Sequence, residues 1–503
     1  DVMAAALGYS WLIDQYGLPS LPLDTGARLD MRIRGRQKTH TGQQLVDLFE
    51  PSYQPEDTLA AQLQFALRYE GVNLQVLALL FAQAGEAELC QWLAGSPSSS
   101  YARQACFLYE RLNAKPLPME DPVSPKTRYV PVVDAELQFC LADGGRISRF
   151  RVLNNLPGKR DFCPMVRNTD VLRTLVRKNL HQRTAEVLAA YDPDLLRRAA
   201  AFLYMKETQS SFEVEREKPS PQRAQRFADL LRQADTREPL SEQRLVELQH
   251  GVLDARFHEF GWRQQQNWIG KDLGFRQQID FVPPRPADVP GLMSGLLQMA
   301  TNMREGMDAV VAATAIAFGF VYIHPFMDGN GRIHRYLIHD VLAKAGFTPR
   351  GMVLPVSAVI LANLPAYIDT LEHFSRPLNQ RTDFNPDTPE LPASGNDAVY
   401  YRYPDFTAQA EFLYGALERT VEEDLQHEIH YLLGFDTAYK SLNAMLDWPP
   451  HSLDLFIRVV QQNAGKLSAG KRKSHFAWLS DSELEQAEVL VQQAFAGKNI
   501  GKA

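Results

Sequence analysis

The sequence is poor in cysteine and has no apolar run long enough to cross a membrane. Its four cysteines form no Cys-x-x-Cys pair and no zinc-type spacing, which argues against a disulfide framework or a zinc site and favours a reducing cytoplasm. The longest apolar segment, just before His324, is shorter than the about 18 residues that a membrane span needs and contains Gly319. No signal-peptide pattern opens the sequence, which starts with Asp1 rather than Met, so a trimmed N-terminal piece is expected.

Strong charge of either sign is also absent. The chain has 53 Lys and Arg against 60 Asp and Glu, a net charge of −7. This mild acidity argues against general nucleic-acid binding, and the small basic run over 466–475 is interpreted as a solvated loop between helices. The sequence contains no Walker-type phosphate loop, no dinucleotide-binding glycine fingerprint and no internal repeat, so the common nucleotide-binding folds are not indicated.

Apolar periodicity predicts a mostly α-helical protein of several domains. With 503 residues, 45% of them hydrophobic, the chain has material for about two to four domains. The predicted divisions are a helical N-terminal domain (1–113), a proline-rich link and an irregular segment with some β character near 129–166 (together 114–166), a helical region (167–239), a central core (240–376), a linker (377–398) and a helical C-terminal domain (399–503).

The densest chemistry lies in the twelve residues His324-Pro-Phe-Met-Asp-Gly-Asn-Gly-Arg-Ile-His-Arg335. The apolar run from Asp308 predicts a buried helix that ends at the His-Pro-Phe corner, because proline disfavours helical angles in the residue before it. A second helix is expected from Arg332 to Gly346. His324 is therefore expected at the end of a rigid element, where a catalytic base can be held.

The glycine turn between these two helices suits an anion. Gly329, Asn330 and Gly331 permit a tight turn whose backbone N–H groups point into one concavity at a helix N-terminus, a setting that favours phosphate. Arg332 and Arg335 lie three apart on one helical face and can both reach phosphate oxygens. A carboxylate in this position, Asp328, suits Mg²⁺, which binds phosphates through one or two carboxylates. Each feature alone is commonly structural, but their combination predicts a triphosphate site.

This segment resembles, position for position, the signature of the Fic family, His-x-Phe-x-(Asp/Glu)-Gly-Asn-Gly-Arg-x-x-Arg. The resemblance implies a mostly α-helical Fic-type core with a small β-hairpin flap. It also implies transfer of AMP from ATP to a hydroxyl side chain of a target protein, with release of pyrophosphate. By that likeness His324 is the general base, Asp328 holds Mg²⁺, Gly329–Gly331 form the anion hole, and Arg332 and Arg335 hold the outer phosphates. Glycine at 331, where some relatives carry lysine, favours AMP transfer over phosphate transfer.

Two further segments extend the resemblance. Residues 266–284 predict two short strands and resemble the family's flap, on which a target protein docks by strand addition; Ile269 and Gly270 would there contact the nucleotide. An ordinary surface hairpin is the alternative. From likeness alone, Asn363 and Tyr367 would contact adenine.

The third segment concerns regulation. Ser211 and Glu215 share one helical face and resemble the family's inhibitory motif, (Ser/Thr)-x-x-x-Glu-(Gly/Asn), whose glutamate pairs with the second motif arginine, here Arg335. Arg216 departs from that pattern, Glu213 offers a second carboxylate nearby, and a chance Ser–Glu pair is the alternative.

The sequence leaves several functions open. The prediction is an autoinhibited adenylyltransferase that uses ATP and Mg²⁺ and modifies Ser, Thr or Tyr of an unidentified protein. The alternatives are an enzyme that removes AMP, alone or in addition, and a regulatory or interaction protein with a vestigial site. Membrane contact is not expected, nucleic acid is not an expected partner, and a homo-oligomer is left open.

Overall fold

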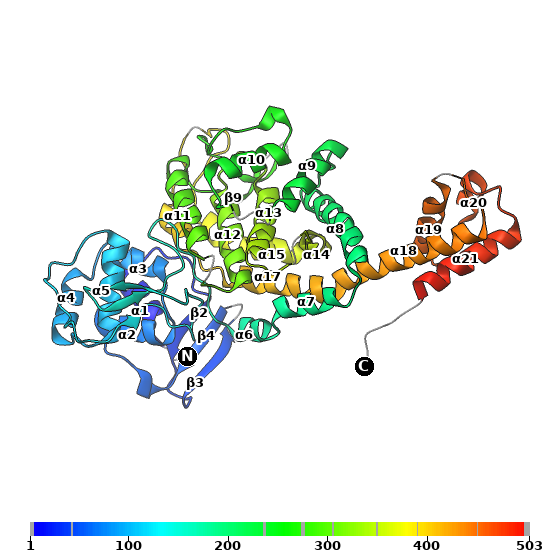
Figure 1. Cartoon of the computed structure of the whole chain (residues 1–503). Coiled ribbons are helices and arrows are strands. Elements are labelled where there is room, and N and C mark those ends of the chain that lie inside the picture. Colours follow the sequence, from blue (N-terminus) through cyan, green and yellow to red (C-terminus); the bar gives the residue numbers. More distant parts are fainter. Residues whose placement is uncertain are drawn as a thin grey trace.

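The computed structural model describes residues 5–41, 44–234, 238–272, 277–303, 306–348, 351–389, 391–449 and 451–496. Helices dominate these residues, and the sheets are small and peripheral (Figure 1). The mostly α-helical class and the small β-hairpin agree with the sequence prediction. No helix within the described ranges has the length and apolarity to cross a membrane.

The N-terminal region combines a sheet with a helical layer. Its four strands take the order β1-β2-β4-β3, with β2 and β4 parallel and β3 and β4 antiparallel. The prediction of a largely helical segment over 1–113 therefore missed this sheet, because β3 contains no apolar residue and β1 has only two residues. The elements are β1 (Ala5–Ala6), α1 (Gly8–Tyr16), β2 (Thr25–Leu29), β3 (Arg36–Thr41), β4 (Gln44–Phe49), η1 (Pro51–Tyr53), α2 (Leu59–Tyr69), α3 (Leu74–Phe81), α4 (Glu86–Gly95) and α5 (Ser100–Asn113).

A short three-stranded sheet follows, in the segment for which some β character was predicted. Its strands are β5 (Val130–Pro131), β6 (Gly145–Ile147) and β7 (Val152–Asn154), in the order β5-β7-β6. Val132, Val133 and Val152 from this segment are buried in the same hydrophobic core as the helices α2 to α5. The segment is therefore packed onto the N-terminal helices rather than lying free as a link.

The central part of the chain surrounds two buried helices, α12 (Ala309–Ile323) and α13 (Asn330–Lys344), which pack against each other. Every residue of α12 from Val310 to Ile323 is buried, as its apolar sequence predicts. The surrounding elements are α6 (Asp170–Arg177), α7 (Leu180–Ala189), α8 (Pro193–Val214), α9 (Pro221–Arg232), α10 (Glu242–Val252), η2 (Ala255–Phe257), β8 (Ile269–Asp272), β9 (Gln277–Phe281), η3 (Pro286–Asp288), α11 (Val289–Asn302), α14 (Val356–Ala362), α15 (Leu364–Asn379), α16 (Ala398–Arg402) and α17 (Thr407–Arg419).

The predicted linker over 377–398 is packed against the core. Helix α15 continues to Asn379, and the chain after it forms an isolated bridge between Asp383 and Ser394. Asn396 is fully buried and donates from Nδ2 to the carbonyl of Pro283, 3.1 Å away, at the end of the β8–β9 hairpin. This segment therefore supports the hairpin instead of separating two domains.

The C-terminal helices form an arm that extends away from the core (Figure 1). Helix α17 continues through a π-helical turn, η5 (Thr420–Asp424), into α18 (Leu425–Met445), and the arm is completed by α19 (Ser452–Gln462), α20 (Ala469–His475) and α21 (Asp481–Ala496). The arm has a separate hydrophobic core that includes Leu442, Phe456 and Val491. The basic run predicted as a loop contains the helix α20, and its Arg472 is ion-paired with Asp481.

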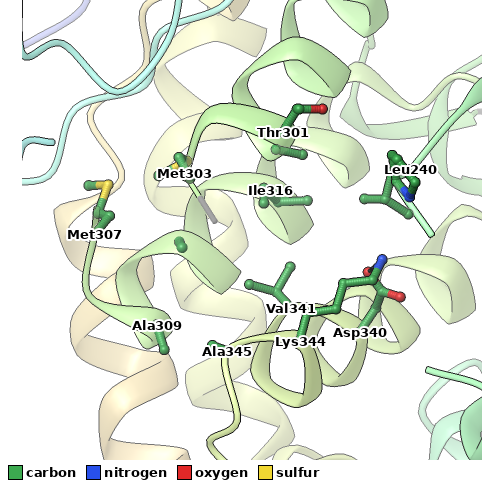
Figure 2. A pocket seen from close by; sticks show the side chains of 13 residues that line it. Leu240, Thr301, Met303, Met307, Ala309, Ile316, Asp340, Val341, Lys344 and Ala345 are labelled. Carbon is green, nitrogen blue, oxygen red and sulfur yellow. Dashed lines mark hydrogen bonds and ion pairs between the residues drawn. The ribbon is translucent and has the colours of Figure 1, made fainter. Parts of the chain in front are cut away.

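A small apolar pocket lies between α11, α12 and α13 (Figure 2). Met303, Ile316 and Val341 form part of its wall, and the ion pair between Asp340 and Lys344, 2.7 Å apart, lies beside them. Its volume of about 50 Å³ has room for one or two water molecules. The pocket is therefore too small to be the nucleotide site predicted from the sequence.

Candidate active site

His324 ends α12 in a left-handed conformation. Its φ of 52° turns the chain out of the helix before Pro325, and its backbone N–H still donates to the carbonyl of Phe320 at 2.9 Å. The ring Nδ1 lies 3.1 Å from the carbonyl of Val321. Because a carbonyl only accepts, Nδ1 carries the proton, and Nε2 is left with the lone pair that a general base needs.

The setting of His324 keeps its imidazole neutral. Burial lowers the pKa of His324 to about 4, and the nearby Arg263 guanidinium acts in the same direction. The hydrogen bond to Val321 and the carboxylate of Glu215 act the other way, but they are weaker than burial. A neutral ring at ordinary pH is the protonation state in which His324 can accept a proton.

Arg263 braces the corner at His324. Its guanidinium donates to the carbonyls of His324, Gln265 and Pro284 at 2.8, 3.0 and 2.5 Å. The side chain is nearly fully buried, and burial lowers its pKa to about 10, so it remains charged. Arg263 thus ties the chain around the candidate base to both ends of the β8–β9 hairpin. The role of Arg263 could not be predicted from the sequence, since a lone arginine outside a motif gives no signal.

The glycine turn joins this corner to α13. Gly329 has a φ of 87°, a left-handed conformation that suits glycine, and it caps the N-terminus of α13. Asn330 holds the turn closed, because its side chain accepts from the backbone N–H of Phe326 at 3.1 Å and donates to the Phe326 carbonyl at 2.7 Å. The first N–H groups of α13 have no acceptor within the helix and follow directly after this turn, a setting that suits an anion.

Asp328 immediately precedes this turn, and its carboxylate is exposed. Its Oδ1 accepts from the N–H of Gly329 at 2.6 Å and is 3.6 Å from Arg332 Nη2. The side chain is 57% exposed, so its second oxygen can face a cation. No cluster of three or more potential metal ligands occurs among the described residues. A Mg²⁺ ion at Asp328 would therefore depend on phosphate oxygens and water for its other ligands.

Arg335 is enclosed by the end of α8. Its side chain is 1% exposed; Nε donates to Ser211 Oγ at 2.9 Å, and Nη2 donates to the Ser211 carbonyl at 2.7 Å and to Glu215 Oε1 at 2.8 Å. Burial alone would raise the pKa of Glu215, but the guanidinium groups of Arg335 and Arg332 hold it below its ordinary value. The structure thus brings Ser211 and Glu215 together with the second motif arginine.

Glu215 also lies directly over the glycine turn. A Cβ placed on Gly331 would come within 2.2 Å of Glu215 Oε1. Only a residue without a side chain leaves room for the carboxylate in this position. Because residue 331 has no side chain, the C-terminal end of α8 can pack against the N-terminus of α13.

Arg332 is held by a different carboxylate, which the sequence analysis missed. Glu217 Oε2 lies 2.5 Å from Arg332 Nη1, and Glu217 Oε1 lies 2.5 Å from Arg223 Nη1 on α9. Glu213, which the sequence offered as a second candidate, is exposed. The available signal was the alternation of acidic residues at 213, 215 and 217.

Arg216, between the two bound carboxylates, occupies a position whose backbone conformation favours the Gly or Asn of the family pattern. Its φ is 58°, in the left-handed region that glycine and asparagine adopt more readily. The N–H groups of Arg216 and Glu217 donate to the carbonyls of Glu213 and Phe212, which closes the C-terminus of α8. Arginine makes this turn at a cost in backbone strain.

The two residues predicted to contact adenine, Asn363 and Tyr367, differ in their burial. Tyr367 is buried in α15 with its ring 6.1 Å from that of His334, whereas Asn363 is exposed at the start of α15. The structure therefore brings Tyr367, but not the Asn363 side chain, to the buried side of α13. The two other histidines of the region are structural, because His334 is bonded to the Ala317 carbonyl and His339 to the buried Glu207.

The hairpin predicted over 266–284 is present as antiparallel β8 and β9, with an irregularity between Ile269 and Gly270. Gly270 approaches its neighbour closely, because a Cβ there would lie 1.9 Å from the Gln278 carbonyl. Ile269 is 37% exposed. The turn at 273–276 lies outside the described residues. Asn267 fixes the hairpin to the motif by donating to the Phe326 carbonyl at 3.1 Å.

Residues 239–342 match the profile of the Fic/DOC family. This part of the chain is a Fic domain. The matched range includes α10, the hairpin, α11, α12, the whole motif and α13 as far as Leu342, while Ser211, Glu215 and Glu217 lie before it.

Sequence similarity to known Fic proteins covers only a short part of the chain. The chain is 38% identical over 71 residues to a protein adenylyltransferase Fic from Nematostella vectensis, covering 14% of this chain and 17% of that protein. It is 38% identical over 69 residues to one from Drosophila ananassae, covering 14% of each. The chain thus spans less than a fifth of the length of these relatives. A Fic-domain-containing signaling protein from Bacteroides thetaiotaomicron aligns over 50% of this chain and 96% of its own, with 18% identity and a TM-score of 0.37.

Proposed function

We propose that this protein is a Fic-type adenylyltransferase that moves AMP from ATP to a Ser, Thr or Tyr hydroxyl of a target protein and is held inactive by Glu215. The observation that carries the proposal is the neutral imidazole of His324, with a free Nε2, beside a helix N-terminus and two arginines. These groups supply a base, an anion site and positive charge, which nucleotidyl transfer needs more than a covalent intermediate.

The reaction follows from these positions. His324 Nε2 takes the proton of the target hydroxyl, whose oxygen attacks the α-phosphorus of ATP. The bond from that phosphorus to the oxygen bridging the β-phosphate breaks, and pyrophosphate leaves with the electron pair. The N–H groups at the start of α13 face the developing negative charge, and Arg332 and Arg335 attract the outer phosphates. A Mg²⁺ ion at Asp328 would supply further charge neutralisation on the phosphates.

In this proposal, Glu215 blocks ATP binding at the site. Its carboxylate satisfies Arg335 and covers Gly331, the position where phosphate oxygens would meet the N–H groups. A phosphate near this carboxylate would also meet like charge, because the lowered pKa of Glu215 keeps it ionised. Productive ATP binding thus requires the chain around Glu215 to move away.

The β8–β9 hairpin is the proposed docking site for the target protein. The two strands pair with each other, and among the described residues no third strand pairs with them. An extended target segment could add to the free edge and be held by backbone hydrogen bonds. Arg263 and Asn267 connect the hairpin rigidly to the corner at His324, so a docked segment would be positioned relative to the base.

One incubation with labelled ATP and Mg²⁺ tests this proposal. The wild type is compared with Glu215→Gly and with His324→Ala in the Glu215→Gly background, each with cell lysate as a source of targets. We expect weak labelling by the wild type, strong labelling by Glu215→Gly and none when His324 is also replaced. Absence of label from all forms would instead favour a regulatory protein with a vestigial site.

A second candidate activity uses the same site in reverse. Glu215 is ionised and 39% exposed beside the anion turn, so it could orient a water molecule towards an AMP group on a modified target. Incubating a prelabelled target with the wild type and Glu215→Gly decides this point. Loss of label with the wild type alone would establish AMP removal, and stable label with both would reject it.

A further inference from the structure

We propose that Arg223, a residue outside the Fic motif, forms with Arg332 a binding position for the terminal phosphate of ATP or for the released pyrophosphate, and that Glu217 occupies this position in the resting protein. The assignment of the ligand rests on the proposed function, whereas the anion site itself rests on the geometry around Glu217.

The carboxylate of Glu217 is bound as one end of a phosphate would be. Each of its two oxygens faces a different guanidinium group, Oε2 facing Arg332 Nη1 and Oε1 facing Arg223 Nη1, both at 2.5 Å. Glu217 is the carboxylate that contacts both guanidinium groups, whereas Asp328 lies 3.6 Å from Arg332 alone. A phosphate group, with more negative charge and three terminal oxygens, would complement the pair better than the carboxylate does.

The two arginines have unused hydrogen-bonding capacity. The Nε atoms of Arg332 and Arg223 are both buried without a hydrogen-bond partner. The side chains are 5% and 15% exposed, so these donors are largely shielded from water. Buried donors in native proteins are nearly always satisfied, and these two unsatisfied donors belong to the same guanidinium groups that hold Glu217.

Both guanidinium groups are held in place by contacts that do not involve Glu217. Arg223 Nη2 donates to the Val252 carbonyl at 2.9 Å, and Arg332 Nη1 lies 3.4 Å from the same carbonyl. The two groups also lie over the Phe212 ring, 5.3 and 5.1 Å from its centroid. The site would therefore persist when Glu217 leaves, and a preorganised site binds its ligand with less loss of entropy.

The position of Glu217 would allow its carboxylate to move away from the two arginines. It lies just beyond the end of α8, its side chain is 34% exposed, and the strained Arg216 precedes it. The same short turn carries Glu215 onto Arg335 and Glu217 onto Arg332. One movement of this turn would free both motif arginines together.

Binding of inorganic pyrophosphate and of AMP to the full-length protein, measured by calorimetry, tests the site without any catalytic turnover. We expect Glu217→Ala to bind pyrophosphate about tenfold or more tightly than the wild type, with AMP binding unchanged. Adding Arg223→Met to Glu217→Ala should remove this gain, and Arg223→Lys should restore part of it. Glu213→Ala, an exposed neighbour, is the matched control and should change neither ligand.

Two outcomes would overturn the site. One is equal pyrophosphate binding by Glu217→Ala and by Glu217→Ala/Arg223→Met, with circular dichroism showing both variants folded. The other is a gain in AMP binding as large as the gain in pyrophosphate binding. A gain that depends on Arg223, in a protein that labels no target, would support the anion site while rejecting the proposed transferase activity.

Discussion

At the scale of single residues, His324 and Arg335 are controlled by different neighbours. His324 is kept neutral by burial and by Arg263, and these contacts belong to the core and the hairpin. Arg335 is held by Ser211 and Glu215, which belong to the end of α8. The proposed base is thus unprotonated in this structure, while the arginine proposed to bind phosphate is already paired with Glu215. Inhibition in this protein would act on nucleotide binding rather than on the protonation of the base.

The lowered pKa of His324 predicts the pH dependence of labelling. The active form is deprotonated, so the rate is lost as pH falls through the pKa. With an ordinary histidine the loss would be centred near pH 6.5, whereas a pKa of about 4 keeps His324 neutral well below pH 6. In Glu215→Gly a carboxylate that raises this pKa is removed, so the rate at saturating ATP should stay flat between about pH 8 and pH 5.5. A fall centred near pH 6.5 would contradict the burial argument.

Replacing the strained arginine should strengthen the inhibited state. Arg216→Gly removes a left-handed non-glycine residue, which costs about 1–2 kcal/mol, and adds the smaller entropic cost of glycine. We expect a net stabilisation of up to about 1 kcal/mol in urea unfolding, together with weaker automodification than the wild type. Lys218→Gly, an exposed neighbour without a left-handed conformation, is the control and should stabilise nothing. Stronger automodification by Arg216→Gly would show that the strain does not loosen the turn.

The sequence predicted only part of the site, and the division has a physical reason. His324, Asp328, Arg332 and Arg335 lie in one contiguous motif, whose turn brings them together whatever surrounds it. The residues that complete the site, Glu217, Arg223 and Arg263, come from other elements, and their roles depend on packing of distant segments. A charged side chain becomes informative only when burial removes it from water, and burial is a property of the tertiary structure.

At the scale of elements, α8 is an integral part of the core rather than a removable lid. Leu203, Tyr204 and Phe212 are buried in the same core as α12 and α13. Glu207, fully buried on the same helix, accepts from His339 Nε2 at 2.7 Å and from the backbone N–H of Ser357 at 2.9 Å. These contacts fix the helix itself. Only its exposed end, from Glu215 onward, is free to move without disrupting the core.

The anchoring role of Glu207 can be measured. Glu207→Gln removes the charge that binds His339 and Ser357, and a broken buried network of this kind costs about 2 kcal/mol or more. We expect a corresponding loss in the free energy of unfolding, measured in urea. Glu213→Gln on the exposed face of α8 is the control and should change stability by less than about 0.5 kcal/mol. Equal stabilities of the two variants would mean that α8 is held by its apolar face alone.

Elements with strong periodicity were predicted well, and those without it were not. The helices around the motif were expected over 308–326 and from Arg332 to Gly346, close to the observed α12 and α13. Their many apolar residues favour buried helices. The N-terminal sheet was missed, because strands such as β3, with the sequence Arg-Gln-Lys-Thr-His-Thr, carry no apolar alternation. Such strands are determined by the partners with which they pair.

At the scale of the whole molecule, the long helix α18 connects two separate hydrophobic cores. Leu425 and Ile429 near its start belong to the core around the Fic domain, while Ala438 and Leu442 near its end belong to the arm. Lys206 and Arg198 on α8 form ion pairs with Glu428 and Asp436, which connect α18 to α8. The arm thus has a core of its own and a single helical connection to the rest.

This organisation predicts that damage to the arm leaves the chemistry intact. Phe456 and Phe320 are both fully buried, one in the arm and the other in the central core, and replacing either with alanine should cost about 3 kcal/mol or more. In the Glu215→Gly background, Phe456→Ala should lower the temperature at which the arm unfolds, seen as a separate calorimetric transition, while labelling with ATP continues. Phe320→Ala should reduce labelling and destabilise the main transition. If Phe456→Ala abolished labelling while the main transition stayed in place, the arm would be required for catalysis, and α18 would transmit its state to α8.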